Sequence, residues 1–233
     1  MRTAWLISAA CLLSIGLFLA GGCGKAMAPK GCWTFDEGSG DVVKNAVGPN
    51  HGRIQGGLER TDGKKGKAAA FDGKGYVLID SAPYLTSAQY TFAAWVKLKD
   101  TGDYQYIVWR GGPAFYSEDE AGRNLDIWVT QVGTLSGILN YQTAAESRLY
   151  LAGSKKVADN QWHLVVCVND GKTVRFYVDG KKDAEGALAG PLAGSDFPLW
   201  IGARPSDVAA TGIIDEVKFF DRALTEKEVA ELK

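Results

Sequence analysis

Residues 162–178 read WHLVVCVNDGKTVRFYV, and this stretch decides the fold class. Its Asp170-Gly171 pair is favoured in the tight turns of β-hairpins, and the residues on both sides of the pair suit β-strands. Because side chains alternate along a strand, Val174 and Phe176 point to one face and the polar residues between them point to the other. The stretch therefore predicts an antiparallel hairpin with one buried face.

Short segments of the same kind recur along the chain, separated by turn residues. Glycine accounts for 29 of the 233 residues, well above its usual share of about 7%, and it follows no collagen-like period. Frequent turns between alternating segments favour short antiparallel strands over parallel strands alternating with helices. The predicted strands are 32–35, 68–71, 76–79, 90–98, 105–110, 124–130, 162–168, 173–178, 199–202 and 213–220.

One helix is predicted, near the C-terminus. Thr225 suits an N-cap and Glu228 follows three residues later, which is the spacing of a capping box. Leu224 and Val229 stand at the two positions of a hydrophobic staple around it. The predicted fold class is all-β, a two-sheet antiparallel sandwich with one short C-terminal helix.

Composition and charge speak against several classes of protein. The chain is 46% hydrophobic and 23% charged, as expected for a globular protein and not for a disordered one. Its net charge is −1 and it has no basic block, so no nucleic-acid partner is expected. It also has no CxxC motif and no cluster of His and Cys, so a zinc site is unsupported.

Residues 1–22 predict a secretory signal of the lipoprotein type. An N-terminal arginine precedes residues 3–20, which are almost wholly apolar and carry no charge. Residues 20–23 read AGGC and resemble the bacterial lipobox, with the usual leucine displaced by one position to Leu19. The pattern predicts that Cys23 carries lipid and anchors the protein to a membrane.

The same segment permits two other interpretations. The motif Ala26-Met27-Ala28 would direct ordinary cleavage and give a secreted or periplasmic protein, whereas an uncleaved segment would itself be an anchor. With a lipidated Cys23 the protein belongs to the bacterial cell envelope. Gly24 stands where an Asp commonly retains lipoproteins in the inner membrane, so the outer membrane is favoured. The predicted division is a signal peptide over 1–22, a tether over 23–30 and one domain over 31–233.

Cys32 and Cys167 are the cysteines inside the predicted domain. An exported chain meets an oxidising compartment, where the two could form a disulfide. Each also has apolar neighbours, among which a free thiol packs as a small hydrophobic group. We expect both to be unpaired.

The order of the short motifs resembles LamG-like jelly-roll domains of the concanavalin A-like lectin/glucanase superfamily. The resemblance covers about residues 30–233 and is weakest over 100–156, where members of such a family differ in ligand. It implies a jelly-roll sandwich. The motifs that carry it are WTFDEGSG (33–40), NHG (50–52), GKAAAFDGKGYV (66–77), TFAAWVK (91–97), QWH (161–163), YVDG (177–180), LWIG (199–202), GIIDEV (212–217) and DRALT (221–225).

Three aspartates are candidate ligands of a structural Ca²⁺. Strand parity places Asp215 on the same side as Val217 and Phe219, and a carboxylate facing an apolar layer needs a cation or several N–H donors. Asp36 and Asp72 each stand beside a glycine-containing turn and could share a cation with it. The resemblance implies such an ion where the terminal strands meet. The alternative is that the aspartates accept backbone N–H bonds in turns.

The sequence offers no recognisable catalytic constellation. The resemblance would imply E-x-D-x-x-E or E-x-D-x-E along one strand for a glucanase, and neither spacing occurs. The acidic run Glu118–Glu120 reads as a solvated loop, and His51 and His163 stand in no nucleophile motif. We therefore expect a protein that is not an enzyme.

Aromatic residues of the middle segment are the candidate ligand-binding residues. Sugar rings stack on aromatic faces and their hydroxyls take hydrogen bonds. Tyr104 and Tyr106 alternate onto one face, and Trp109-Arg110 beside a Gly-Gly-Pro turn is the candidate for an exposed platform. The other tryptophans of the predicted domain are expected mainly in the core, and they are Trp33, Trp95, Trp128, Trp162 and Trp200.

These observations predict a non-catalytic binding module outside the cytoplasm. Its expected partner is a glycan or a cell-surface protein. Two alternatives stay open. One is a divergent glycoside hydrolase with acids on separate loops, such as Glu118 or Glu120. The other is a structural or adhesion module that contacts only protein.

Overall fold

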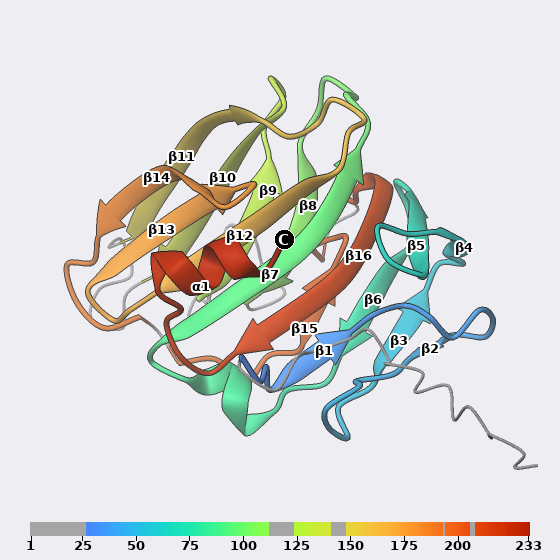
Figure 1. Cartoon of the computed structure of the whole chain (residues 1–233), viewed down its shortest axis with the longest axis horizontal. Helices are drawn as coiled ribbons and strands as arrows, with labels where there is room; N and C mark the ends of the chain where they lie inside the picture. The colour runs from blue at the N-terminus through green and yellow to red at the C-terminus, as the bar shows by residue number, and fades with distance from the viewer. Residues whose placement is uncertain (1–26, 112–123, 141–147, 193, 206–207) are drawn as a thin grey trace, which may run out of the picture.

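The computed structural model describes residues 27–111, 124–140, 148–192, 194–205 and 208–233. They form two eight-stranded antiparallel sheets packed face to face, with one short helix on the outside (Figure 1). We call the sheet nearest the viewer in Figure 1 the front sheet and the other the back sheet. The predicted all-β sandwich with one short C-terminal helix is confirmed.

Each sheet combines segments that are far apart in the sequence. The front sheet has the order β14 (Lys181–Ala187), β13 (Thr173–Val178), β12 (His163–Asn169), β7 (Tyr90–Leu98), β16 (Thr211–Phe220), β5 (Lys67–Asp72) and β4 (Glu59–Asp62), with β1 (Gly31–Trp33) also paired to β16. The back sheet has the order β11 (Arg148–Lys156), β10 (Thr134–Asn140), β9 (Leu125–Val129), β8 (Gln105–Arg110), β15 (Leu199–Ile201), β6 (Tyr76–Ile79), β3 (Gly52–Gln55) and β2 (Val42–Val43). The helices are η1 (Pro83–Thr86) and α1 (Glu226–Glu231).

The hairpin predicted from 162–178 forms as expected. Strand β12 pairs with β13, with Cys167 opposite Phe176 and Asn169 opposite Val174. Asp170 closes the turn by accepting hydrogen bonds from the backbone N–H groups of Lys172 and Thr173. The same two strands continue the front sheet through β7.

The main core lies between the sheets and is built by alternation. Along β7, Phe92, Ala94, Val96 and Leu98 face it, as the pattern predicts. Trp33 is fully buried there and joins the N-terminal strand to the core.

Three of the register shifts in the two sheets re-aim a side chain. In β8 the register shifts between Tyr106 and Val108, so that two successive residues face the core. In β16 it shifts between Asp215 and Lys218. In β14 it shifts where Asp183 has no partner on β13.

Helix α1 covers the outer face of the front sheet (Figure 1). The predicted capping box is present: the Thr225 Oγ1 accepts from the Glu228 N–H and the Glu228 carboxylate accepts from the Thr225 N–H. Val229 and Leu232 pack onto a second apolar cluster with Trp95 of the sheet. Within the described residues no helix has the length and apolar character needed to cross a membrane.

The two domain cysteines differ in state. Cys167 is a free, buried thiol, and burial raises its pKa to about 12. Cys32 is disulfide-bonded, and its partner lies outside the described residues. The two therefore do not pair with each other, and the expectation that both are free is wrong for Cys32.

Candidate functional site

Aromatic side chains gather on the outer face of the back sheet. They come from four consecutive strands of the sheet, β6, β15, β8 and β9, and from β11, which lies beyond β10. We call this set the aromatic face, and its members are Tyr76, Tyr106, Trp109, Trp128, Tyr150 and Trp200.

The pairing of the strands brings these rings together. Trp200 stands opposite Trp109, and Tyr106 stands opposite Trp128. The bulge in β8 is essential here, because without it residues 106 and 109 would point to opposite faces. Their rings lie edge to face with centroids 5.9 Å apart, a geometry that the ring quadrupoles favour.

The middle of the aromatic face is closed and its two ends are open. Tyr106, Trp109 and Trp128 are 95% or more buried, packed with Ile138 and Trp200. At one end Tyr150 is 57% exposed, with its ring centroid 6.0 Å from that of Trp128.

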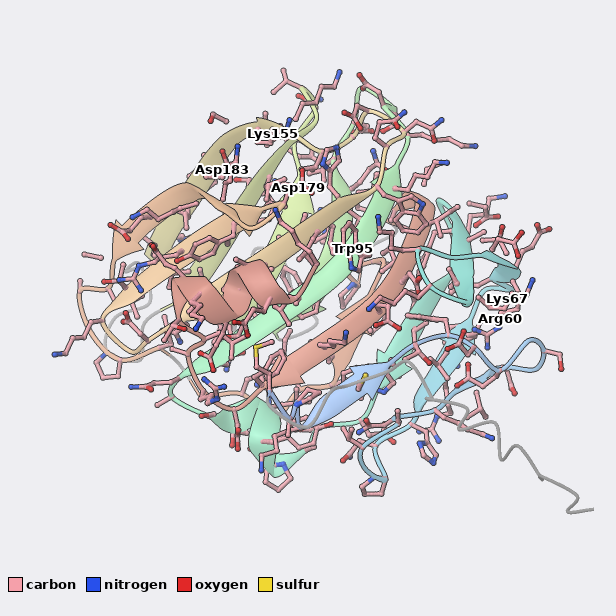
Figure 2. All side chains as sticks on the ribbon, viewed as in Figure 1. Arg60, Lys67, Trp95, Lys155, Asp179 and Asp183 are labelled. Carbon is pink, nitrogen blue, oxygen red and sulfur yellow. The ribbon has the colours of Figure 1, made fainter. Side chains whose placement is uncertain are left out.

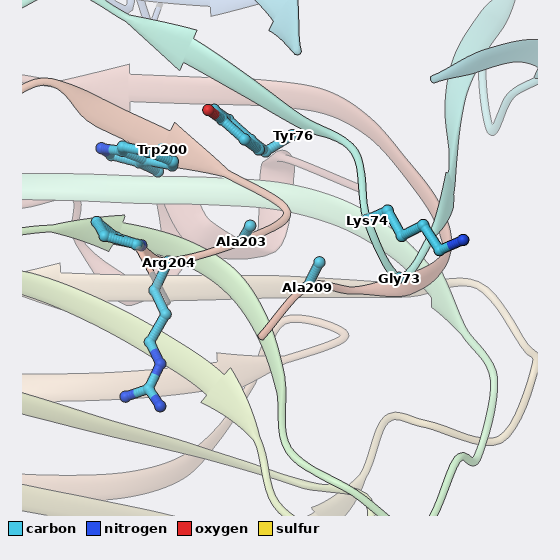
Figure 3. Close-up of a pocket in the computed structure, with 8 residues that line it drawn as sticks. Gly73, Lys74, Tyr76, Trp200, Ala203, Arg204 and Ala209 are labelled. Atoms are coloured by element: carbon cyan, nitrogen blue, oxygen red, sulfur yellow. The ribbon is translucent and has the colours of Figure 1, made fainter. Parts of the chain in front are cut away.

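A pocket of about 330 Å³ lies at the other end (Figure 3). Tyr76 and Trp200 form one wall, with ring centroids 4.4 Å apart and planes inclined by 28°. Both rings are half-buried, so each keeps surface for a ligand. Lys74, from the β5–β6 turn, also lines this pocket.

Arg204 ties the pocket to the closed part of the face. In Figure 3 its side chain extends away from the rings of Tyr76 and Trp200. Its guanidinium lies 4.8 Å from the ring centroid of Tyr106, and its Nη1 donates to the Tyr106 hydroxyl over 3.1 Å. It therefore fixes the ring of Tyr106 and leaves the stacked pair accessible.

The buried part of the face also holds polar groups. The Trp128 indole N–H is buried without a hydrogen-bond partner in the described part of the chain, an arrangement that costs free energy. Asp126 lies on the same side of β9 and is 1% exposed.

The residues predicted to bind ligand separate into different environments. Tyr104 is 47% exposed and precedes β8, whereas Tyr106 is buried in the aromatic face. Trp109 is also buried, so the prediction that it forms an exposed platform is wrong. Trp200, which stands opposite it on the neighbouring strand, is half-buried and keeps exposed ring surface.

Arg110 is wrong as a ligand-binding residue because it is 1% exposed. Its guanidinium donates to the backbone carbonyls of Leu85, Ser195 and Phe197, and to the side chain of Asn124. Burial lowers its pKa to about 10. Arg110 therefore holds η1 and the segment before β15 against the end of β8.

The three candidate calcium ligands do not form one cluster. Asp72 lies in the β5–β6 turn and accepts from the N–H groups of Lys74 and Gly75. Asp36 accepts from the Lys67 N–H at 2.8 Å, at the start of β5. Only Asp36 and Asp215 therefore approach the same turn, the one that joins β4 to β5.

Asp215 is buried, but not in the apolar layer that its parity predicted. The bulge in β16 places it opposite Trp95 on the outer face, while Val217 and Phe219 face the core. Its oxygens accept backbone N–H bonds from Lys65 at 3.0 Å and from Glu216 at 2.7 Å. Burial raises its pKa to about 6, and these hydrogen bonds act in the opposite direction.

This arrangement does not fit a calcium site. Calcium takes six to eight oxygen ligands, whereas the carboxylates here face backbone N–H groups, whose positive ends oppose a cation. Across the described ranges, no group of three or more His, Cys, Asp or Glu side chains is placed to hold a metal ion. The geometry matches the alternative in which the aspartates close turns.

The acidic run and the two histidines are the other groups that the sequence offers as candidates for catalysis. Glu118–Glu120 lie outside the described residues. His163 is buried, with Nδ1 2.8 Å from Asp179 Oδ2 and Nε2 3.1 Å from Asp159 Oδ1. His51 Nδ1 accepts from the Asn45 N–H. Both histidines therefore have structural contacts.

Sequence reasoning missed the pair that forms the pocket wall. The sequence pattern predicts a strand at Tyr76 without indicating a binding role, and it favours the core for Trp200. One signal was available: Leu199 and Ile201 flank Trp200, and both face the core, so Trp200 must face outward.

The fold and this face define a class, the two-sheet jelly-roll β-sandwich. A family model for the concanavalin A-like lectin/glucanases superfamily matches residues 71–230. The chain belongs to this superfamily. No curated protein gives a significant match to the sequence.

Solved structures of several binding and enzyme proteins share the fold. The binding domain of Paraclostridial Mosquitocidal Protein 1 aligns with a TM-score of 0.69 at 14% identity, over 87% of this chain and 51% of that one. Domain 4 of AbnA, a GH43 extracellular arabinanase from Geobacillus stearothermophilus in complex with arabinotriose, aligns with a TM-score of 0.61 at 22% identity, over 88% and 97%.

A third structure is the Trypanosoma rangeli sialidase in complex with the inhibitor DANA. It aligns with a TM-score of 0.63 at 15% identity, over 87% of this chain and 32% of that one. This chain thus spans about half of the mosquitocidal binding domain and about a third of the sialidase. At these identities the likeness concerns the fold.

Proposed function

We propose that the protein is a non-catalytic carbohydrate-binding module that uses the aromatic face. The observation that carries the proposal is the stacked pair Tyr76 and Trp200, half-buried beside a pocket of about 330 Å³. Sugars present C–H groups on their ring faces, and these groups stack on aromatic rings. The family and its arabinotriose-bound relative support a glycan as the ligand.

The architecture behind the pair supports this role. Trp200 packs against the buried cluster that contains Trp109 and Tyr106, whose two rings lie edge to face, and Arg204 holds Tyr106 in place. A platform that is fixed before the ligand arrives loses little conformational entropy on binding. Tyr150, at the far end of the face, would contact an oligosaccharide long enough to cross the strands between them.

The absence of catalysis is part of the proposal. Hydrolysis by the usual route needs two carboxyl groups flanking the scissile bond. Strand β9, in the middle of the aromatic face, carries one carboxylate, that of Asp126. This residue is 1% exposed, so its carboxylate is not placed to flank a bound sugar. A surface partner made of protein is the alternative, and the same experiment addresses it.

The test is a binding screen against oligosaccharides, with arabinotriose among them. The purified protein should bind at least one glycan, and Trp200→Ala should weaken that binding about tenfold or more. Trp162→Ala is the matched control, since Trp162 is also half-buried but packs on the front sheet. Equal losses in both variants, or binding to no glycan, would remove the proposal.

We also propose that the protein is anchored to the bacterial envelope by lipid on Cys23. The lipobox-like AGGC and the apolar segment before it support this. Lipid would occupy the thiol of Cys23, and cleavage before Cys23 would remove Cys11. Because Cys167 is free, the anchored protein would then lack the disulfide of Cys32 described above and would contain Cys32 as a thiol.

Mass spectrometry and thiol counting test the anchor. The membrane fraction should contain a lipidated N-terminal Cys23 and two titratable thiols after denaturation without reductant. A soluble product that retains Cys23 in a disulfide would rule the anchor out. Cys23→Ser should release the protein from membranes if the proposal holds.

A further inference from the structure

A second pocket, of about 680 Å³, lies where the edges of the two sheets meet. One edge is β11 of the back sheet and the other is β14 of the front sheet. In Figure 2, the labelled Lys155, Asp179 and Asp183 mark this end of the sandwich. The pocket is far from Tyr76 and Trp200 in the order of the strands. Strand β11 is at one edge of the back sheet, whereas β15 and β6 are the fourth and fifth strands after it.

The bulge in β14 builds one wall of this pocket. It turns Asp183 toward β11, where its Oδ1 accepts from the N–H and the hydroxyl of Ser154 at 3.1 and 3.0 Å and from the Lys155 N–H at 3.0 Å. A side chain at Gly153 would clash with the other oxygen, Oδ2. The two sheet edges are thus fixed relative to each other by one carboxylate.

Four lysines from three segments line the same cavity: Lys155 on β11, Lys181 and Lys182 on β14, and Lys233 at the C-terminal end. Lys182 forms an ion pair with Glu185 at 3.2 Å. Among the described residues, the other three ammonium groups form no salt bridge.

Among the described residues, the two aspartates that line the pocket form no ion pair with these lysines. Asp183 is directed at the backbone of β11, as described above. Asp179 accepts from the Leu164 N–H and contacts His163 at 2.8 Å. The lining therefore holds four ammonium groups, three of them without an ion pair among the described residues, beside two carboxylates and the Ser154 hydroxyl.

We propose that this lysine pocket is a second binding site and that it takes an acidic saccharide. The ammonium groups would bind its carboxylate, sulfate or phosphate, and the Ser154 hydroxyl oxygen would accept a hydrogen bond from a sugar hydroxyl. The volume lies in the range of cavities that hold small organic ligands, about 300–1,000 Å³, and exceeds what a free inorganic anion needs. The site does not depend on the aromatic face.

Lysines on edge strands also protect sheets from edge-to-edge pairing. That role requires only exposed charge on each strand. It requires neither a shared cavity nor the contribution of Lys233, which comes from outside both strands. The two roles predict different results in a binding experiment.

Calorimetry of the full chain with a sulfated tetrasaccharide, and with the same tetrasaccharide after desulfation, tests the proposal. Only the sulfated form should bind in the pocket. The double variant Lys155→Gln with Lys181→Gln should weaken binding about fivefold or more. The matched double variant Lys44→Gln with Lys172→Gln, which removes the same charge at exposed sites outside the pocket, should stay within about twofold.

Three results would overturn the lysine pocket as a saccharide site. Equal losses in the two double variants would show that only net charge matters. Equal binding of the desulfated form would remove the need for an anion. Complete displacement by inorganic sulfate at the same concentration would show a site for a free anion. Trp200→Ala should leave this binding unchanged, so failure here and failure at the aromatic face are distinguishable.

Discussion

The two outer faces of the sandwich carry similar aromatic residues but use them differently. On the front sheet, Tyr177 and Phe220 are buried in the apolar cluster that packs against α1, and Trp95 of the same cluster is buried with the Lys64 ammonium 4.2 Å from its ring centroid. On the back sheet, Tyr76 and Trp200 form a stack beside an open pocket, and no helix of the described residues lies over them. An outward aromatic residue therefore marks a candidate binding site only where no segment of the same chain covers it.

The largest effect is expected on the covered face. Phe220→Ala should lower the free energy of unfolding by about 3–5 kcal/mol, because it leaves a cavity beneath α1. Glycan affinity of the folded fraction should stay within about twofold, since the residue is on the opposite side of the sandwich. Urea denaturation and calorimetry measure the two quantities. A large loss of affinity with little loss of stability would contradict the division between the faces.

On the open face the balance should reverse. Tyr76→Ala should reduce glycan affinity by about tenfold, equivalent to about 1.4 kcal/mol, because one half of the stacked pair is lost. The free energy of unfolding should fall less than for Phe220→Ala, since Tyr76 is only half-buried. Unchanged affinity in this variant would mean that ligand does not contact the pair.

The attachment of α1 should depend on pH. Hydrogen bonding to Arg222 lowers the pKa of Glu228 to about 2, so the group adds stability above its unfolded pKa of about 4.5 and loses it as pH falls toward 2. Glu228→Gln should therefore cost about 0.5–1 kcal/mol at pH 7 and much less near pH 2.5. Thermal melts of both proteins across this range measure it, and a pH-independent difference would contradict the assignment.

The smallest effect is expected at Tyr104. Its side chain is exposed and lies outside the aromatic face, so Tyr104→Ala should change the free energy of unfolding by less than about 0.5 kcal/mol. Glycan affinity should also be unchanged. A tenfold loss of affinity would extend the binding surface to the start of β8 and restore Tyr104 as a ligand-binding residue.

The sequence predicted the fold well because its signals are local. The Asp170-Gly171 turn, the capping box at Thr225 and the alternation along β7 are each set by neighbouring residues. It missed β2–β4, β10, β11 and β14. Several of these are polar strands at or near a sheet edge, where only weak alternation is required.

The candidate site was harder to predict because bulges change which way side chains point. Strand alternation predicts the wrong face for Asp215, because a bulge follows it at Glu216. Glu216 is not a glycine, yet it adopts a φ of 50°, and no sequence motif indicates the bulge. Strand alternation fails again between Tyr106 and Trp109. Arg110 illustrates a different limit: its partners are backbone carbonyls distant in sequence, which no local pattern reveals.

Nuclear magnetic resonance of the tryptophan indole N–H groups during glycan titration tests the central claim most directly. We expect the Trp200 signal to shift and saturate, while the signals of Trp33 in the core and Trp95 on the outer face of the front sheet stay in place. A shift of Trp95 with Trp200 unmoved, at the same ligand concentrations, would place the ligand on the other face and contradict the account.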